Sequence, residues 1–405
     1  MKRGEVTLMI LSDFSKAFDT IKYKTVLKEL NYLWFSKSFL NWTIEYLTDR
    51  WHFVQVDDKT SDRRRFNFGV TQGSILRTLI FNLYVADLHT HVNMQCRQYA
   101  DDTTLYAHCK PSNLESYKRD LNNSLYNLDE WSRNANLVIN PSKTKMMVLS
   151  TKQLSSAHAI EHLNMKIAVN NENIERIPST KLLGTYVNQH LKREYNVKYI
   201  CTSCYSILAM LRKVKNLLPF HIRKNLAQAL VLSKLSYNDI FHHSLPEYLT
   251  ARLHRVQKAA ASFVNGKYAK TCDILKLNWL PVTEQREWHI LKSTHKSLYS
   301  SDWPNYLRLE TYENNRNLRS SKGIQLQRSM IANTFQDEAA NLFNNLPLSL
   351  RNCMDPILFF KETKKLLQDK ARPMLYFSFL FSFHCKYHLL SVFNLVFSEF
   401  ILNCN

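Results

Sequence analysis

Two adjacent aspartates between β-rich runs constrain this chain more than any other feature of its sequence. Residues 95–100 and 103–107 are rich in strand-forming side chains, and Asp101 and Asp102 stand at the junction of these runs. We therefore expect a hairpin with both carboxylates at its tip. Adjacent carboxylates repel each other, so this placement favours a bound cation.

Another carboxylate follows a strand near the start of the chain. Val6 to Leu11 is a continuous apolar run of strand length, and Asp13 comes just after it. At the end of a strand, the side chain of Asp13 can leave the core and meet solvent or a metal ion.

A glycine-flanked turn, Gly69 to Ser74, leads into a helical stretch that should extend to Leu88. The chain has only six glycines, and two of them, Gly69 and Gly73, fall within these few residues. Glycine permits turns and close backbone contacts that other residues do not. We therefore expect the backbone to approach another segment closely at this turn.

Together, the three segments place hard oxygen ligands on separate elements that one sheet can bring side by side. Mg²⁺ prefers a few carboxylates plus substrate phosphate oxygens. Two such ions ~3.5–4 Å apart can activate an attacking hydroxyl and stabilise the leaving oxygen of a phosphoryl transfer. Each motif alone also fits a plain surface turn or helix entry, but the three in this order favour two-metal chemistry.

The charge of the chain points to a polyanionic partner. The formal net charge is +20, while 45% hydrophobic and 22% charged residues are typical of a globular protein. Residues 191–270 hold 14 Lys and Arg against three Asp and Glu. A solvated helix face is the plain interpretation, whereas a phosphate-binding surface is favoured by the imbalance and the interleaved tyrosines. The predicted nucleic-acid-binding residues are Arg212, Lys213, Lys215, Arg223 and Lys224.

Cysteine usage and the C-terminal tail bear on the compartment. Eight cysteines without framework spacing indicate a reducing, intracellular compartment, nuclear or cytoplasmic. Cys201 and Cys204 lack the further ligands that zinc needs, so two buried thiols on a helix are expected. The aromatic tail, residues 373–405, has apolar runs shorter than the ~18–20 residues of a spanning helix. A membrane protein is therefore the weakest interpretation.

The three motifs, taken together, resemble the palm motifs of reverse transcriptases. The residues of these motifs most resemble those of the polymerase of jockey-like non-LTR retrotransposons. Other segments agree with this resemblance, which covers about residues 5–353. They are the Asn140-Pro141-Ser142-Lys143-Thr144 stretch within residues 137–149, the primer-grip-like Leu182-Leu183-Gly184-Thr185, and two downstream stretches, residues 277–282 and 344–351.

The resemblance implies roles for particular residues. Asp13, Asp101 and Asp102 would be the catalytic, metal-binding carboxylates: Asp13 and Asp101 would ligate both Mg²⁺ ions, for which Mn²⁺ can substitute, and Asp102 would complete the set. Phe18 would be the aromatic gate that clashes with a ribonucleotide 2′-hydroxyl. The other residues assigned to the substrate are Phe14, Gln72, Gly73 and Lys143, with Lys145 competing for the last role.

The resemblance also implies fold, domains and partners. We expect an α+β (mixed α/β) palm with an antiparallel sheet and packed helices over residues 1–190, an all-α basic thumb over residues 191–270, and a helical C-terminal region over residues 271–372. The function implied is RNA-directed DNA synthesis by two-metal nucleotidyl transfer. Its partners would be an RNA template, a DNA primer and deoxynucleoside triphosphates, with no membrane.

Departures from the family pattern leave alternatives open. Thr71 stands where the family normally has proline, and Arg77 and Thr78 stand where it has Gly-Pro. The chain begins almost at the first catalytic strand, so we expect an N-terminally truncated copy without most of the fingers or the upstream endonuclease. The alternative is a catalytically inactive nucleic-acid-binding remnant of such an element. An intron-encoded maturase is less favoured because the downstream stretches resemble retrotransposon segments.

Overall fold

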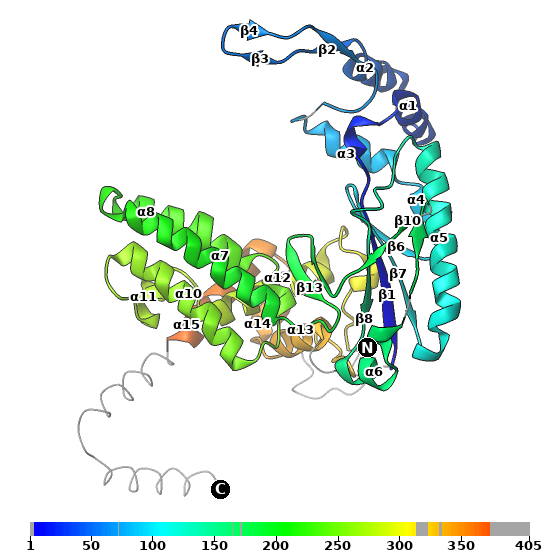
Figure 1. Ribbon diagram of the computed structural model, residues 1–405. Coiled ribbons are helices and arrows are strands. Elements are labelled where there is room, and N and C mark those ends of the chain that lie inside the picture. The colour runs from blue at the N-terminus through cyan, green and yellow to red at the C-terminus, as the bar shows by residue number, and fades with distance from the viewer. Residues whose placement is uncertain are drawn as a thin grey trace, which may run out of the picture. The chain divides into compact units, whose positions relative to one another are not determined.

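The computed structural model describes residues 4–71, 73–163, 165–170, 172–312, 323–331 and 334–372. Contacts divide the chain into two compact units, with the boundary between Lys192 and Arg193 (Figure 1). The first unit combines a sheet with helices, and the described part of the second unit is almost entirely helical. The predicted fold class, a mixed palm followed by helical regions, is confirmed in these elements.

The first unit is built on a five-stranded sheet with the strand order β11-β8-β1-β7-β6. All neighbouring pairs are antiparallel except β11 with β8. The predicted strand before Asp13 and the predicted hairpin arms are therefore confirmed. The strands are β1 (Val6–Ser12), β6 (Gln95–Tyr99), β7 (Asp102–Cys109), β8 (Lys145–Leu149) and β11 (Glu175–Arg176).

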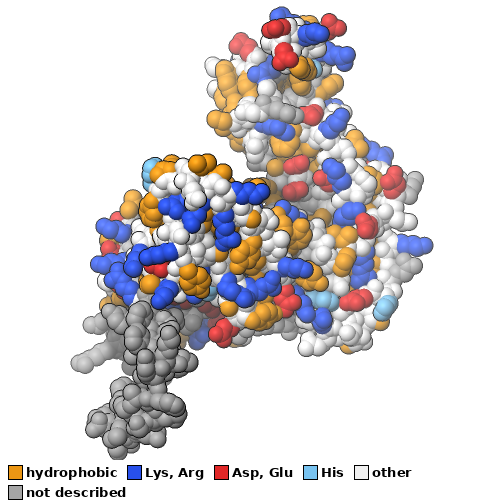
Figure 2. Space-filling view, turned by 60° about the vertical axis from the view of Figure 1, so that its left-hand side comes forward, with side chains coloured by type: hydrophobic (Ala, Val, Ile, Leu, Met, Phe, Trp, Pro, Cys, Tyr) orange, Lys and Arg blue, Asp and Glu red, His pale blue; other side chains and the backbone are white. Residues whose placement is uncertain are grey.

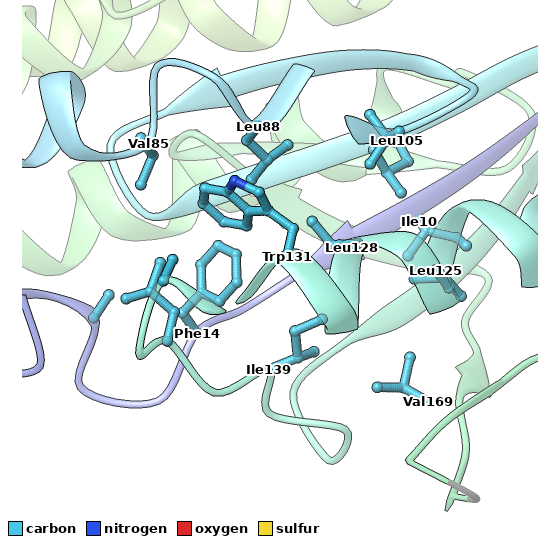
Figure 3. Close-up of a cluster of buried hydrophobic side chains, with 14 of the residues drawn as sticks. Ile10, Phe14, Val85, Leu88, Leu105, Leu125, Leu128, Trp131, Ile139 and Val169 are labelled. Carbon is cyan, nitrogen blue, oxygen red and sulfur yellow. The ribbon is translucent and has the colours of Figure 1, made fainter. Parts of the chain in front are cut away.

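A long amphipathic helix, α5 (Leu114–Asn134), packs on one face of this sheet (Figure 1). The pattern is local in origin, because residues three and four apart share one face of a helix. Leu121, Leu125 and Leu128 recur at that spacing and are all buried. Figure 3 shows Leu125 and Leu128 beside Ile10 of β1 and Leu105 of β7, which places the core of the unit between helix and sheet.

Shorter elements complete the first unit. The predicted helix over residues 74–88 is two helices, because a turn at residues 85–87 separates α3 from α4. The predicted strands over residues 51–56 and 63–68 are shorter than expected and form two successive ladders, β2–β5 and β3–β4. The helices are α1 (Tyr23–Tyr32), α2 (Lys37–Leu47), α3 (Leu76–Tyr84), α4 (Leu88–His91) and α6 (Lys152–Ala157). The short strands are β2 (Arg50–His52), β3 (Gln55–Val56), β4 (Lys59–Thr60), β5 (Arg64–Phe66), β9 (Ala168–Val169), β10 (Glu172–Asn173), β12 (Ser179–Leu182) and β13 (Thr185–Asn188).

The hairpin β12–β13 turns through Leu183 and Gly184 alone, and both residues have positive φ, 43° and 81°. Positive φ at both central positions is the geometry that makes a two-residue turn match the twist of its strands. The hairpin expected from the Leu-Leu-Gly-Thr segment is therefore present, and its primer-grip role stays a prediction.

The second unit contains two hydrophobic clusters, one drawn from residues 197–282 and the other from residues 280–367. Cys201 and Cys204 are buried side chains of α7, as expected for structural thiols, and burial raises the pKa of Cys204 to about 12. The helices are α7 (Glu194–Lys213), α8 (Phe220–Ala227), α9 (Ser233–Ser236), α10 (Glu247–Asn265), α11 (Thr271–Lys276), α12 (Val282–Tyr299), α13 (Phe335–Asn344), α14 (Leu348–Arg351) and α15 (Pro356–Ala371). The division into thumb and C-terminal region stays a prediction.

No helix within the described residues is long and apolar enough to cross a membrane. The predicted aromatic tail, residues 373–405, lies outside the described residues.

Candidate active site

The paired ends of two central strands bring Asp13 and Asp102 together. In the antiparallel ladder between β1 and β7, Ser12 is the partner of Thr103. The ladder ends at this pair, so Asp13 and Asp102 flank it at the same end of the two strands, close enough for the charge of Asp13 to raise the pKa of Asp102. The prediction that Asp13 lies at a strand end beside the aspartate hairpin is confirmed.

The third carboxylate, that of Asp101, belongs to the turn of the same hairpin. Tyr99 pairs with Asp102 across β6 and β7, so Ala100 and Asp101 alone form the connection. Ala100 has a φ of 52°, a left-handed conformation that costs a non-glycine residue roughly 1–2 kcal/mol. Such strain is concentrated at functional sites. Here it closes the hairpin with two residues, so Asp101 lies at the tip, directly before the strand that Asp102 begins.

The electrostatics of the cluster favour a cation. Partial burial raises the pKa of the Asp102 carboxyl, and the negative charges of Asp101 and then Asp13 raise it further. Three buried polar atoms at the strand ends, Ser12 Oγ, Asp13 Oδ2 and Thr103 Oγ1, have no hydrogen-bond partner within the described residues. A carboxylate oxygen without a donor, beside two other carboxylates, is a group that a divalent ion would satisfy.

Lys143 is the cation that the structure places in this cluster. Its Nζ lies 3.4 Å from Asp13 Oδ2, an ion pair without hydrogen-bond geometry. The turn that carries Lys143 is held to the first motif, because Asn140 N donates to the Asp13 carbonyl at 2.8 Å. Lys145, the competing candidate, pairs instead with Glu175 at 2.6 Å.

The two phenylalanines of the first motif have different environments. Phe14 is 4% exposed and points into the core toward Trp131 (Figure 3), so its side chain packs the segment that carries Asp13 against the core. Phe18 is only partly buried, and its ring centroid lies 4.4 Å from that of Phe81 on α3. The aromatic surface expected of a sugar gate is thus available at Phe18 and absent at Phe14.

The glycine turn packs against the first motif. Gly69 N donates to the Ile21 carbonyl and Val70 N to the Phe18 carbonyl, both at 2.9 Å. A Cβ on Gly69 would lie 2.8 Å from the Cα of Asp19, so the expected close backbone approach is confirmed there. Gly73 has a φ of 84° and no described atom within 4 Å of a built Cβ. Gln72 lies outside the described residues.

The contact between Arg77 and Phe18 was not predicted from the sequence. The Arg77 guanidinium carbon lies 4.0 Å from the centroid of the Phe18 ring. The signal in the sequence was that Arg77 stands where the family pattern has glycine, from which a perturbed pocket or a contact with a phosphate is expected, but not a contact with an aromatic ring.

The five predicted nucleic-acid-binding residues of the second unit divide into two groups. Arg212 and Lys213 are exposed in the last turn of α7, and Lys224 is half-buried on α8. Lys215 Nζ donates to the Gly266 carbonyl at 3.2 Å, and Arg223 Nη1 donates to the Phe263 carbonyl at 3.5 Å. Lys215 and Arg223 therefore cap the C-terminus of α10, as basic groups do at helix ends. Figure 2 shows Lys and Arg side chains interspersed with hydrophobic ones over the visible face of the molecule.

The donor set suits an ion that the substrate helps to bind. In the described part of the chain, no three acidic, His or Cys side chains gather closely enough to enclose a metal ion. Mg²⁺ in phosphate-handling sites takes one or two carboxylates and completes its shell with substrate phosphates and water. Asp13, Asp101 and Asp102 fit that pattern, because they line one edge of the sheet as an open set.

Part of the chain is similar in sequence to known proteins. The family model of the reverse transcriptase (RNA-dependent DNA polymerase) matches residues 1–204. The chain is 26% identical over 215 residues to "Probable RNA-directed DNA polymerase from transposon BS" of Drosophila melanogaster, which covers 51% of this chain and 23% of that protein. It is 25% identical over 151 residues to "RNA-directed DNA polymerase from mobile element jockey" of the same organism, which covers 35% of this chain and 16% of that protein.

Among solved structures, apo telomerase from Candida tropicalis is similar with a TM-score of 0.37 and 12% identity, covering 69% of this chain and 46% of that chain. The chain spans less than a quarter of the length of the two Drosophila relatives. The resemblance seen in the sequence is confirmed, since the family model matches half of the chain and the relatives are polymerases of non-LTR elements. The chain belongs to the reverse transcriptase family.

Proposed function

We propose that this chain catalyses RNA-directed DNA synthesis as part of a non-LTR retrotransposon polymerase. The observation that supports the proposal is the pairing of Ser12 with Thr103, which brings the strand ends that carry Asp13 and Asp102 together, with Asp101 in the adjoining two-residue turn. Reverse transcriptases generally use divalent metal ions. The proposed ions are two Mg²⁺, for which Mn²⁺ can substitute, and the proposed partners are an RNA template, a DNA primer and deoxynucleoside triphosphates.

Asp13, Asp101 and Asp102 would hold the ions. Bound there, the ions would lower the barrier to attack by the primer hydroxyl and to departure of pyrophosphate. The residues of the chain itself orient the substrates. The partly buried ring of Phe18 offers a flat surface to the sugar, and Lys143 offers a positive charge beside Asp13, where the triphosphate would lie.

Primer extension tests this proposal. The purified chain, Mg²⁺, poly-rA and oligo-dT should yield extended primer, and the Asp13→Ala and Asp101→Ala variants should lose the product. Asp102→Asn should retain more activity than Asp101→Asn if the second carboxylate is peripheral. An Asp101→Ala variant as active as the parent would exclude this chemistry.

A second candidate, binding of nucleic acid without polymerisation, is favoured by the basic end of α7. Arg212 and Lys213 are exposed there and no described acidic group pairs with them, so they are available to phosphates. Binding needs charge and shape but no metal ion. This candidate would be supported over the enzyme if the parent binds an RNA–DNA duplex but extends no primer, and Asp101→Ala binds the duplex as the parent does.

A further inference from the structure

The Phe18 ring is held by one face of α3. Arg77 and Phe81 are four residues apart on this helix, so their side chains emerge on the same face. The Arg77 Cζ lies 4.0 Å from the Phe18 ring centroid, and the Phe81 ring centroid lies 4.4 Å from it. One helical turn thus supplies both a cation and an aromatic ring to the same side chain.

The contact with the ring accounts for the position of the Arg77 guanidinium. Its Nε is buried and has no hydrogen-bond partner within the described residues, which leaves the Phe18 ring as a contact that compensates its desolvation. The buried Nε is not available to a phosphate of a nucleotide, whereas the two Nη groups are not buried in this way. A cation over an aromatic face is attracted more strongly as water is excluded.

The backbone of Phe18 is held as well. The Phe18 carbonyl accepts from Val70 N at 2.9 Å, and Gly69 N donates to the Ile21 carbonyl at 2.9 Å, so the two segments are locked on both sides. With the backbone held, the remaining freedom of Phe18 is rotation of its side chain. The contact with Arg77 restricts that rotation.

From these contacts we infer that Arg77 is a positioning residue for nucleotide selection, which clamps the Phe18 ring and so sharpens the rejection of ribonucleotides. The inference rests on the proposed function. A steric gate discriminates only as well as its ring stays in place, because a ring that can turn aside admits the 2′-hydroxyl. Where glycine stands at this position, no side chain covers the ring from residue 77.

The experiment compares incorporation of dTTP and UTP on poly-rA primed with oligo-dT, as the ratio of their kcat/KM values. Arg77→Met keeps much of the side-chain volume but removes the charge, and it is expected to lower this ratio about fivefold, the equivalent of a ~1 kcal/mol contact. Arg77→Lys keeps a cation and should restore the ratio to within about twofold of the parent. Arg63→Ala is the matched control, since it removes an arginine that lies 5.7 Å over another ring, that of Phe53.

A double variant separates action through the ring from direct action on the nucleotide. In a Phe18→Ala background the ratio is already low, and Arg77→Met should change it no further. Circular dichroism of each variant establishes that it is folded. An equal effect of Arg77→Met with and without Phe18, or a parental ratio in Arg77→Met, overturns the inference and leaves the proposed function standing. A parent that incorporates no dTTP overturns both.

Discussion

Replacement of Gly69 by alanine tests the close contact on which the shape of the nucleotide site depends. The added Cβ would lie 2.8 Å from both the Cα and the carbonyl oxygen of Asp19 and 2.9 Å from its carbonyl carbon. All three are backbone atoms, so no side-chain rotation can relieve the overlap. The segment that carries Phe18 would have to move away from the turn.

Gly73→Ala provides the matched control, because Gly73 shares the conformation but not the contact. The φ values are 81° at Gly69 and 84° at Gly73, and no described atom lies within 4 Å of a Cβ built on Gly73. Each variant loses roughly 1–2 kcal/mol of the free energy of unfolding, because alanine is disfavoured in the left-handed conformation. A gain of ~0.4–1 kcal/mol offsets part of this loss, because alanine lowers the entropy of the unfolded chain. Only Gly69→Ala adds an overpacking cost of about 1–3 kcal/mol. The free energy of unfolding of Gly69→Ala should therefore be about 1–3 kcal/mol lower than that of Gly73→Ala.

Hydrogen exchange measures this difference in the first unit alone. The most protected amides of β1 and β7 report the free energy of opening of that unit. In Gly69→Ala the protection of these strands should fall well below that in Gly73→Ala, while peptides of α10 in the second unit exchange as in the parent. Equal losses in the two variants, within ~0.5 kcal/mol, would refute the steric argument.

Three further predictions concern charge. Asp102→Asn should raise the melting temperature at neutral pH, because the pKa of Asp102 is raised in the folded protein and its ionised form opposes folding. This gain in melting temperature should shrink as the pH falls through the raised pKa. It should vanish below about pH 3.9, the ordinary pKa of an aspartate. A melting temperature lowered at neutral pH would contradict this sign. Lys143→Met should change the free energy of unfolding by less than about 1 kcal/mol, because the lysine side chain is 65% exposed. It should nevertheless lower dTTP incorporation by about tenfold or more. Lys145→Met, which breaks the pair with Glu175, should lower dTTP incorporation less. The triple variant Arg212→Ala/Lys213→Ala/Lys224→Ala is tested by filter binding of an RNA–DNA duplex at several salt concentrations. The slope of log K against log salt concentration should become shallower by about 0.7–0.9 for each phosphate contact removed. Lys215→Ala/Arg223→Ala should instead raise hydrogen exchange at the C-terminus of α10, because both side chains donate to carbonyls there. An unchanged salt slope in the triple variant would mean that Arg212, Lys213 and Lys224 belong to a solvated helix face.

Much of the site was predictable because its parts depend on short-range rules. An apolar run followed by Asp13 is a strand that ends at a carboxylate, and two strand-forming arms around an aspartate pair are a hairpin. The glycines at positions 69 and 73 indicated a turn with unusual backbone angles, and both have positive φ. The ends of these elements were less predictable, as the break between α3 and α4 shows.

The roles of individual side chains were harder to predict. Phe14 and Phe18 belong to one motif, yet Phe14 fills the core and only Phe18 is partly open. Lys215 and Arg223 contribute to the charge of a basic segment, yet they cap a helix that ends some 40 to 50 residues later in the chain. Composition counts charges, but it does not show which carbonyl or carboxylate a charge will meet.

The sequence by itself determined the local elements of the site: the strand before Asp13, the tight turn before Asp102 and the glycine-bearing turn. These follow from propensity, burial and backbone sterics over a few residues. The tertiary structure alone decided that Lys143 lies at Asp13 and that Arg77 covers Phe18. Those pairs join residues about 60 to 130 positions apart, and their contacts arise only when the sheet and α3 pack, because side-chain attractions act over a few ångströms and carry no signal along the chain.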